Sequence, residues 1–269
     1  MRRRFIQLRS VGSLLAIASI AAIALYIMTH HPQRHPVPIT TPTGKSTDEP
    51  TIADRVRQFG PEARRHWQPL FSNARINYPP RELILVGLKL ERRLLIYAAD
   101  DAHTPTLVRD LPIRAASGTL GPKLREGDRQ VPEGLYRIDW LNPNSRHTLS
   151  LHITYPNDFD LQHARAEGRD QPGTDIMIHG GNTSIGCLAI GDEPSIDLFI
   201  LAADTGIENL RVILSPVDFR VRSLPADRPP APAWTAALYA QIDAELRPLP
   251  APGPPATTSD SRPAPAGPR

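Results

Sequence analysis

The only cysteine of the chain, Cys187, stands eight residues after His179 in the stretch DIMIHGGNTSIGCLAIGD. A thiol can attack a carbonyl carbon when a nearby base takes its proton, and an imidazole is such a base. Gly180 and Gly181 permit a sharp turn after His179, so a loop of seven residues can bring the two side chains within hydrogen-bonding distance. Gly186 leaves room for a carbonyl beside the backbone N–H groups that precede the thiol. The pattern indicates a thiol nucleophile with its base.

The same residues allow other interpretations. A free cysteine is often a small buried hydrophobe rather than a nucleophile. The loop GGNTSIG lacks the lysine of a phosphate-binding loop. Nothing around Ser184 resembles a nucleophile elbow, so we expect its hydroxyl to bond the loop or the substrate. A zinc peptidase built on His152, His163 and His179 would lack a recognisable ligand spacing.

The composition is that of a globular protein with unusual ends. Its net charge of +3 is spread over 269 residues without a long basic run or an aromatic ladder. No nucleic-acid partner is therefore expected. The 30 prolines cluster near the two ends, where such a composition is typical of linkers and tails.

The first thirty residues have the pattern of a membrane segment. Four arginines lie within residues 1–10, and residues 11–28 then run without a charge, a length that suits a helix across about 30 Å of hydrocarbon. Arginines stay in the cytoplasm, so everything after residue 28 is expected on the other side. The apolar run is long for a cleaved signal peptide and ends in a poor cleavage site. We predict a single-pass signal anchor, followed by a proline-rich linker over residues 29–50.

The body of the chain, residues 51–246, is rich in strand signals and fits one domain. Strands are expected near residues 83–88, 94–98, 107–117, 135–140, 148–156, 176–178 and 210–216. Helices are expected over residues 51–59, 61–71, 192–205 and 232–246, with a break at Gly60 between the first two. The stretch TLSLHITYP alternates, which places His152 on the polar face of a half-buried strand. Residues 247–269 are expected to be a disordered proline-rich tail.

The stretch IMIHGGNTSIGC resembles the active-site motif of the L,D-transpeptidase catalytic-domain family, in which a His-Gly pair precedes Ser-x-Gly-Cys. The resemblance continues in GPKLREGDRQVPEGLYRI, YPNDFD and SPVDFR, and covers about residues 80–222. It implies a mainly β fold with a few helices, a β-sandwich of mixed sheets with the cysteine in a groove. It also implies chemistry on peptidoglycan stem peptides without a cofactor. The domain would then lie in the periplasm, held to the inner membrane by the transmembrane helix at residues 11–28.

The resemblance assigns roles to single residues. Cys187 is the nucleophile, and His179 is the proton donor and acceptor. Gly180 supplies the backbone carbonyl that orients the imidazole, and Gly186 forms the oxyanion hole together with Cys187. Ser184 matches the serine of the motif.

Two features depart from the commonest members of that family. Ile185 stands where they have a second histidine, and the gap between the first histidine and the cysteine is shorter. The short motif resembles instead a branch that includes a periplasmic amidase, which cuts the link between peptidoglycan and the outer-membrane lipoprotein. A covalent step at Cys187 is therefore expected, while the acceptor is open. An amine acceptor gives a cross-link, and water gives hydrolysis by a carboxypeptidase or amidase; a non-catalytic peptidoglycan-binding module is a further alternative.

Basic residues near the motif suggest how a stem peptide is held. Arg165 and Arg169 are candidates for binding its carboxylates, because a guanidinium matches a carboxylate bidentately. Lys123, Arg125 and Arg129 suggest the same role with less support.

Overall fold

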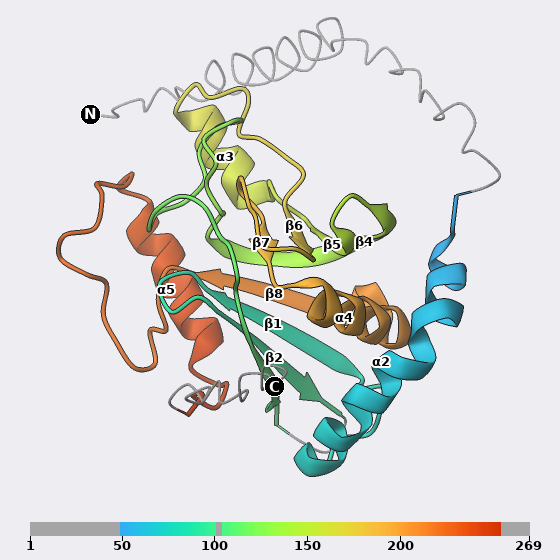
Figure 1. The fold of residues 1–269 in the computed structure, drawn as a ribbon. Helices are drawn as coiled ribbons and strands as arrows, with labels where there is room; N and C mark the ends of the chain where they lie inside the picture. Colours follow the sequence, from blue (N-terminus) through green and yellow to red (C-terminus); the bar gives the residue numbers. More distant parts are fainter. Residues whose placement is uncertain (1–48, 101–103, 254–269) are drawn as a thin grey trace, which may run out of the picture. The chain divides into compact units, whose positions relative to one another are not determined.

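The computed structural model describes residues 49–100 and 104–253. They form one eight-stranded mixed sheet, in the order β3-β2-β1-β8-β4-β5-β6-β7, with helices packed against it (Figure 1). The strands are β1 (Glu82–Leu88), β2 (Arg93–Ala99), β3 (Thr106–Pro112), β4 (Gly134–Ser145), β5 (Thr148–Ile153), β6 (Met177–His179), β7 (Leu188–Ala189) and β8 (Leu210–Ser215). The helices are α2 (Ile52–Ala74), α3 (Asp158–Ala166), α4 (Asp192–Thr205) and α5 (Thr235–Leu246), with a short 3-10 helix η1 (Ile207–Asn209).

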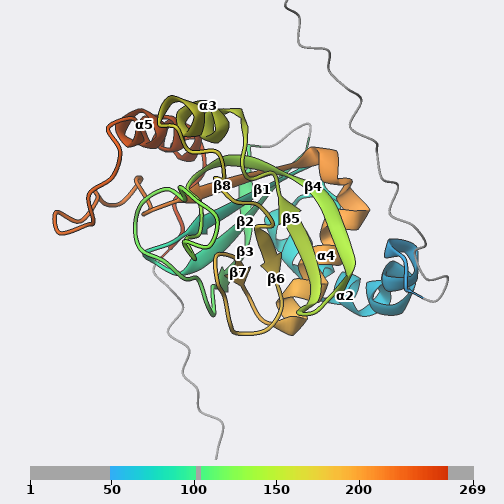
Figure 2. The same ribbon diagram turned by 90° about the horizontal axis from the view of Figure 1, so that it is seen from above.

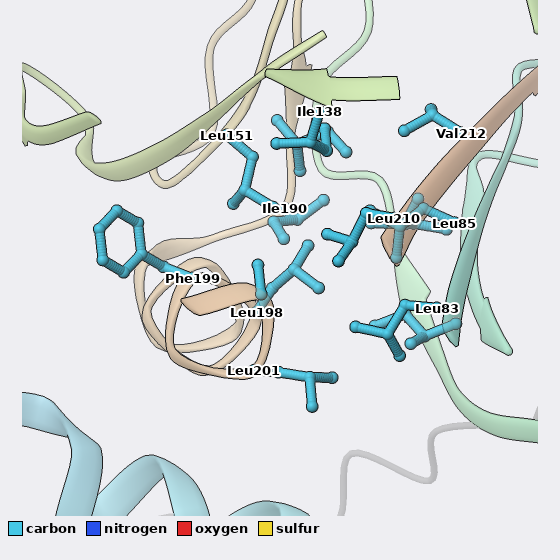
Figure 3. Close-up of a cluster of buried hydrophobic side chains, with 14 of the residues drawn as sticks. Leu83, Leu85, Ile138, Leu151, Ile190, Leu198, Phe199, Leu201, Leu210 and Val212 are labelled. Atoms are coloured by element: carbon cyan, nitrogen blue, oxygen red, sulfur yellow. The ribbon is translucent and has the colours of Figure 1, made fainter. Parts of the chain in front are cut away.

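The first half of the sheet is buried on both faces. The predicted hairpin is confirmed as β1 and β2, which pair antiparallel, and β8 lies parallel on the other side of β1. Leu83 and Leu85 face a core that includes α2 and α4, whereas Ile84 faces a second core under α5. This two-sided burial explains why β1 is a continuous apolar run. Figure 3 shows the first core, in which Leu198 and Leu201 of α4 lie near the leucines of the sheet.

The sandwich of mixed sheets that the resemblance implies is here one mixed sheet that curls at β4. The first four residues of β4 pair with β8, and its later residues pair with β5 (Figure 2). A shift of register between Asn142 and Ser145 accommodates Pro143, which has no N–H to offer the ladder. The strand is therefore longer than the predicted residues 135–140, and it carries β5, β6 and β7 as the second half of the sheet.

One continuous helix, α2, occupies the region where the sequence predicts two. Thr51 starts it with a capping box, and Gly60 and Pro61 lie inside it. Trp67 and Phe71 are buried on its inner face against the first core. Gly and Pro usually interrupt a helix, but the packing of this helix against the first core stabilises it across Gly60 and Pro61.

Two further elements differ from the prediction. Helix α3 was not expected, although Asn157 and Asp160 form a capping box at its start. The two-residue strand β7 directly after Cys187 was not expected either. The helices predicted after the cysteine and near the C-terminus are confirmed as α4 and α5.

The predicted membrane anchor and the basic N-terminus lie outside the described residues, as does almost all of the linker. Within residues 49–100 and 104–253, no helix has the length and apolar character needed to cross a membrane. The prediction of a disordered tail from residue 247 is wrong at its start. Leu249 is buried in the second core, and the Pro250 carbonyl accepts a hydrogen bond from the Tyr97 hydroxyl at 2.8 Å. Residues 254–269 of that tail are outside the described residues.

Candidate active site

The candidate site lies on the loop that joins β6 to β7. These short strands are parallel, and Ile178 pairs with Leu188, so the register sets Cys187 beside Met177. Ile178 and Leu188 are buried in the first core. Because side chains alternate along a strand, Cys187 and His179 turn to the opposite face of the sheet. The two residues that the sequence singles out therefore share one face.

Glycines shape this loop. Gly181 and Gly186 have φ angles of 73° and 131°, a region that other residues rarely adopt. A Cβ on Gly180 would lie 2.7 Å from the carbonyl oxygen of His147. The loop conformation thus depends on the glycines that precede Cys187.

His179 is held as a neutral base. Its Nδ1 lies 2.6 Å from the carbonyl oxygen of Gly180, the contact that the resemblance implies. A carbonyl can only accept, so Nδ1 donates its hydrogen and Nε2 keeps a free lone pair. Burial lowers the pKa of His179, a lowering that His147 adds to and the hydrogen bond to Gly180 opposes. The imidazole is consequently unprotonated near pH 7 and can accept a proton at Nε2.

Cys187 is held as a thiol. Its Sγ accepts a hydrogen bond from the Met177 N–H at 3.4 Å and lies 3.6 Å from the Asp175 carbonyl oxygen. Burial raises the pKa of the Cys187 thiol, against a smaller lowering by the Met177 N–H. The site therefore rests as thiol and imidazole rather than as a thiolate–imidazolium pair, and attack on a carbonyl needs His179 as a general base.

Both side chains line one groove of about 650 Å³. Ile185, directly before Gly186, projects into solvent at the groove with 78% of its surface exposed. Further lining residues include Lys123, Glu126, Arg129, His147, Asp175 and Ser184. The volume of the groove lies within the range of ligand-binding sites, about 300–1,000 Å³.

The predicted oxyanion hole is not open in this structure. The N–H groups of Gly186 and Cys187 both donate to Ser184 Oγ, at 3.2 and 3.0 Å. Ser184 Oγ in turn donates to the carbonyl oxygen of Cys187 at 2.6 Å. The prediction that the Ser184 hydroxyl bonds the loop is confirmed. The hydroxyl occupies both N–H groups that the resemblance assigns to the oxyanion, because the turn brings them to one point.

Comparison with known proteins identifies a family for part of the chain. The family model of the L,D-transpeptidase catalytic domain matches residues 81–212. YafK of Escherichia coli (strain K12), named as a candidate L,D-transpeptidase, is 41% identical over 85 residues. The chain carries an L,D-transpeptidase-family domain. The aligned segment covers 31% of this chain and 32% of YafK, so the chain spans about a third of the length of this curated relative.

Several solved structures are similar to part of this chain. The helical cell shape determining protein Pgp2 from Campylobacter jejuni is 22% identical over 56% of each chain, with a TM-score of 0.40. Bd1075 from Bdellovibrio bacteriovorus is 15% identical over 62% of this chain and 54% of that chain, with a TM-score of 0.37. L,D-transpeptidase 1 from Mycobacterium tuberculosis is 15% identical, covers 50% of this chain and 62% of that chain, and has a TM-score of 0.29.

The cations that line the groove of the L,D-transpeptidase-family domain are not the ones favoured from the sequence. Arg165 lies on α3 outside the lining, and Arg169 donates to the Leu124 carbonyl at 2.6 Å on another part of the surface. Lys123 and Arg129 line the groove instead. Sequence proximity favoured Arg165 and Arg169, but the fold turns α3 away from the thiol.

The three histidines of the zinc interpretation lie on different elements and do not converge. His152 of β5 bonds Asp139 at 2.6 Å, and His163 of α3 stacks on Trp234 with a centroid distance of 4.5 Å. Among the described residues, one metal-capable cluster occurs, formed by His66, Glu193 and Asp197. The Asp197 carboxylate there already pairs with His66 and Arg109, so the cluster is explained as an ion-pair network.

Sequence reasoning missed His147. It lies in the turn between β4 and β5, and its ring centroid is 4.7 Å from that of His179. No motif marks it, because the contact joins residues far apart in the chain.

Proposed function

We propose that this domain is a peptidoglycan-modifying cysteine acyltransferase, which acts on diaminopimelate-containing stem peptides through a thioester at Cys187. One observation carries the proposal: Cys187 shares a groove with His179, whose Nδ1 is fixed on the Gly180 carbonyl while Nε2 is free. The family domain supports the class of substrate.

In the first half of the reaction, His179 Nε2 takes the thiol proton and Cys187 Sγ attacks the carbonyl carbon of the diaminopimelate residue. The tetrahedral intermediate carries negative charge on the former carbonyl oxygen. Its C–N bond then breaks, and the amine of the next residue leaves with the proton from His179. The enzyme is left as a thioester with a neutral imidazole.

In the second half, the neutral imidazole of His179 takes a proton from the incoming nucleophile. Attack by an amine of a second stem peptide forms an amide cross-link and returns the proton to the Cys187 sulfur. Attack by water would give a free carboxylate, as in an L,D-carboxypeptidase or an amidase acting on the link to a lipoprotein. We favour transfer because the groove beside the thiol is open, so that an amine can approach the thioester from solvent.

The oxyanion needs donors that the resting loop does not offer. The N–H groups of Gly186 and Cys187 would serve it once the Ser184 hydroxyl turns aside. A rotation about the Cα–Cβ bond of Ser184 is enough to move its hydroxyl away from the two N–H groups. The backbone already directs both N–H groups at the point where the oxyanion would lie. Ser184 would thus hold the loop ready for the substrate.

Arg129 is the groove cation best placed to bind a stem-peptide carboxylate. Arg129 lines the groove, and its backbone is left-handed, with φ 55°. Lys123 also lines the groove, but its ammonium group already pairs with Asp128 at 2.6 Å. We expect Arg129→Ala to raise KM for stem peptides about tenfold with little change in kcat, since it removes ground-state binding. Arg125→Ala, an exposed arginine of the same loop that does not line the groove, is the matched control. An equal effect of both variants would contradict this role.

The segment at residues 11–28 supports a location in the inner membrane with the domain in the periplasm. A fusion of alkaline phosphatase after residue 50 should be active in cells, because that enzyme folds only outside the cytoplasm. A phosphatase-inactive fusion that is stably produced would contradict this location.

The function is tested by incubating the full-length protein in detergent with cross-linked and uncross-linked muropeptides and analysing the products by mass spectrometry. New dimers with a diaminopimelate-to-diaminopimelate bond are expected. Shortened stems or released lipoprotein peptide without dimers would identify a hydrolase instead.

Cys187→Ser is the matched variant for this experiment. It should lose turnover and thioester formation while its melting temperature stays close to that of the wild type, because the change is nearly isosteric. Turnover like that of the wild type in Cys187→Ser would overturn the mechanism. Binding of muropeptides without any product would favour a non-catalytic module.

A further inference from the structure

His147 contacts both His179 and the residue after it, Gly180. The two imidazole rings lie 4.7 Å apart between centroids and are inclined by 31°. The carbonyl oxygen of His147 accepts the Gly180 N–H at 3.0 Å, and Gly180 is the residue whose own carbonyl holds His179 Nδ1. One residue of the β4–β5 turn therefore contacts the ring of the base and also bonds the N–H of Gly180, the residue whose carbonyl orients that ring.

The two histidines differ in exposure. His179 is 4% exposed, whereas His147 is exposed and lines the same groove. The exposed ring of His147 thus lies against the buried ring of His179. A charge on the His147 ring lowers the pKa of His179.

We propose that His147 is a positioning residue for His179, which holds the base by ring contact and by its carbonyl and sets the pH below which the base stops working. The proposal rests on the proposed function, since it takes His179 as the base. A charge on His147 disfavours a second charge on His179 and so keeps the inner ring unprotonated at lower pH. Loss of that charge should let His179 take up a proton at higher pH.

Several other charged groups lie around the two rings. The groove brings Lys123, Glu126, Arg129 and Asp175 to the same opening as His147 and His179. Behind the loop, the Asp192 carboxylate accepts from the Gly181 N–H at 2.8 Å and from Thr148 at 2.6 Å. Arg146 precedes His147 in the turn and is exposed. The direct ring contact sets His147 apart from all of these groups.

Two substitutions separate the ring contact from the charge. His147→Phe keeps an aromatic ring against His179 and removes the charge, whereas His147→Ala removes both. His163→Phe is the matched control, because His163 is another stacked, partly exposed histidine that lies on α3 against Trp234.

The readouts need no peptidoglycan. Cys187 is the only cysteine, so the rate of its alkylation by iodoacetamide reports the thiol and its base in the full-length protein. Titration of the His179 ring by NMR gives its pKa directly. A failure of the muropeptide reaction would leave these measurements intact, which separates this inference from the proposed function.

With His147→Phe, we expect the pKa of His179 to rise and the acid limb of the alkylation profile to move to higher pH. The rate at pH 8 should stay within about twofold of the wild type. With His147→Ala, the rate at pH 8 should fall about tenfold as well, because the ring is no longer held. A profile of His147→Phe that superimposes on the wild type, or a loss at pH 8 equal to that of His147→Ala, would overturn the proposal. So would an equal shift in His163→Phe.

Discussion

The loop that carries the nucleophile should depend on one hydroxyl, that of Ser184. Its Oγ accepts from the Gly186 N–H at 3.2 Å and the Cys187 N–H at 3.0 Å and donates to the Cys187 carbonyl at 2.6 Å. Ser184→Ala removes all three hydrogen bonds and leaves the backbone atoms in place. The substitution therefore tests whether the hydroxyl, rather than the glycines alone, fixes the loop.

The magnitude follows from the number of bonds. A hydrogen bond contributes about 1 kcal/mol net, so the three together amount to about 3 kcal/mol. The site lines an open groove, where water can replace part of what is lost. We therefore expect the loop to be destabilised by about 2 kcal/mol, which corresponds to about a thirtyfold larger population of the open loop.

Amide hydrogen exchange of the full-length protein measures this population directly. In Ser184→Ala, the N–H groups of Gly186 and Cys187 should exchange about thirtyfold faster than in the wild type. Thr183→Ala is the matched control, because Thr183 is exposed on the same loop and its side chain makes no hydrogen bond within residues 49–100 and 104–253. Its exchange rates should be unchanged.

Two results would refute this reasoning. Unchanged protection in Ser184→Ala would mean that the hydroxyl does not hold the loop. Rapid exchange of both N–H groups already in the wild type would mean that they face the groove, as the sequence resemblance implies for an oxyanion hole.

Two further predictions concern buried charges. Lys89 pairs with Glu133 at 2.8 Å, and both side chains are nearly buried. Lys89→Met should lower the free energy of unfolding by about 3–5 kcal/mol in urea denaturation. The reason is that Glu133 would keep a buried charge without its partner. Addition of Glu133→Gln should recover part of the loss, and a cost below about 1 kcal/mol would contradict the argument. Burial raises the pKa of Asp160 to about 6, whereas the pKa of an aspartate in an unfolded chain is about 3.9. The folded state therefore binds this proton more tightly than the unfolded state does. As a result, the free energy of unfolding falls as the pH rises from about 4 to 6. The free energy of unfolding, measured by urea denaturation, should fall by about 2 kcal/mol less between pH 4 and pH 7 in Asp160→Asn than in the wild type. An unchanged pH dependence in this variant would contradict the assignment.

The sequence by itself predicted features that depend on neighbours along the chain. The hairpin of β1 and β2 and the ends of α4 follow from local patterns that the structure confirms. The short spacing of His179 and Cys187 was likewise enough to expect both on one loop. A short connection limits how far two side chains can separate, whatever surrounds them.

The tertiary structure decided what depends on packing between distant segments. The helix α2 runs through Gly60 because buried contacts stabilise it, and residues 247–253 are held because Leu249 enters a core whose walls come from β1, β2 and β8. In the groove, the fold selects Arg129 rather than Arg169 and brings His147 against His179. The direction of a side chain and the identity of its neighbours depend on how the whole core packs. They cannot be predicted from the helix or strand propensity of a short segment.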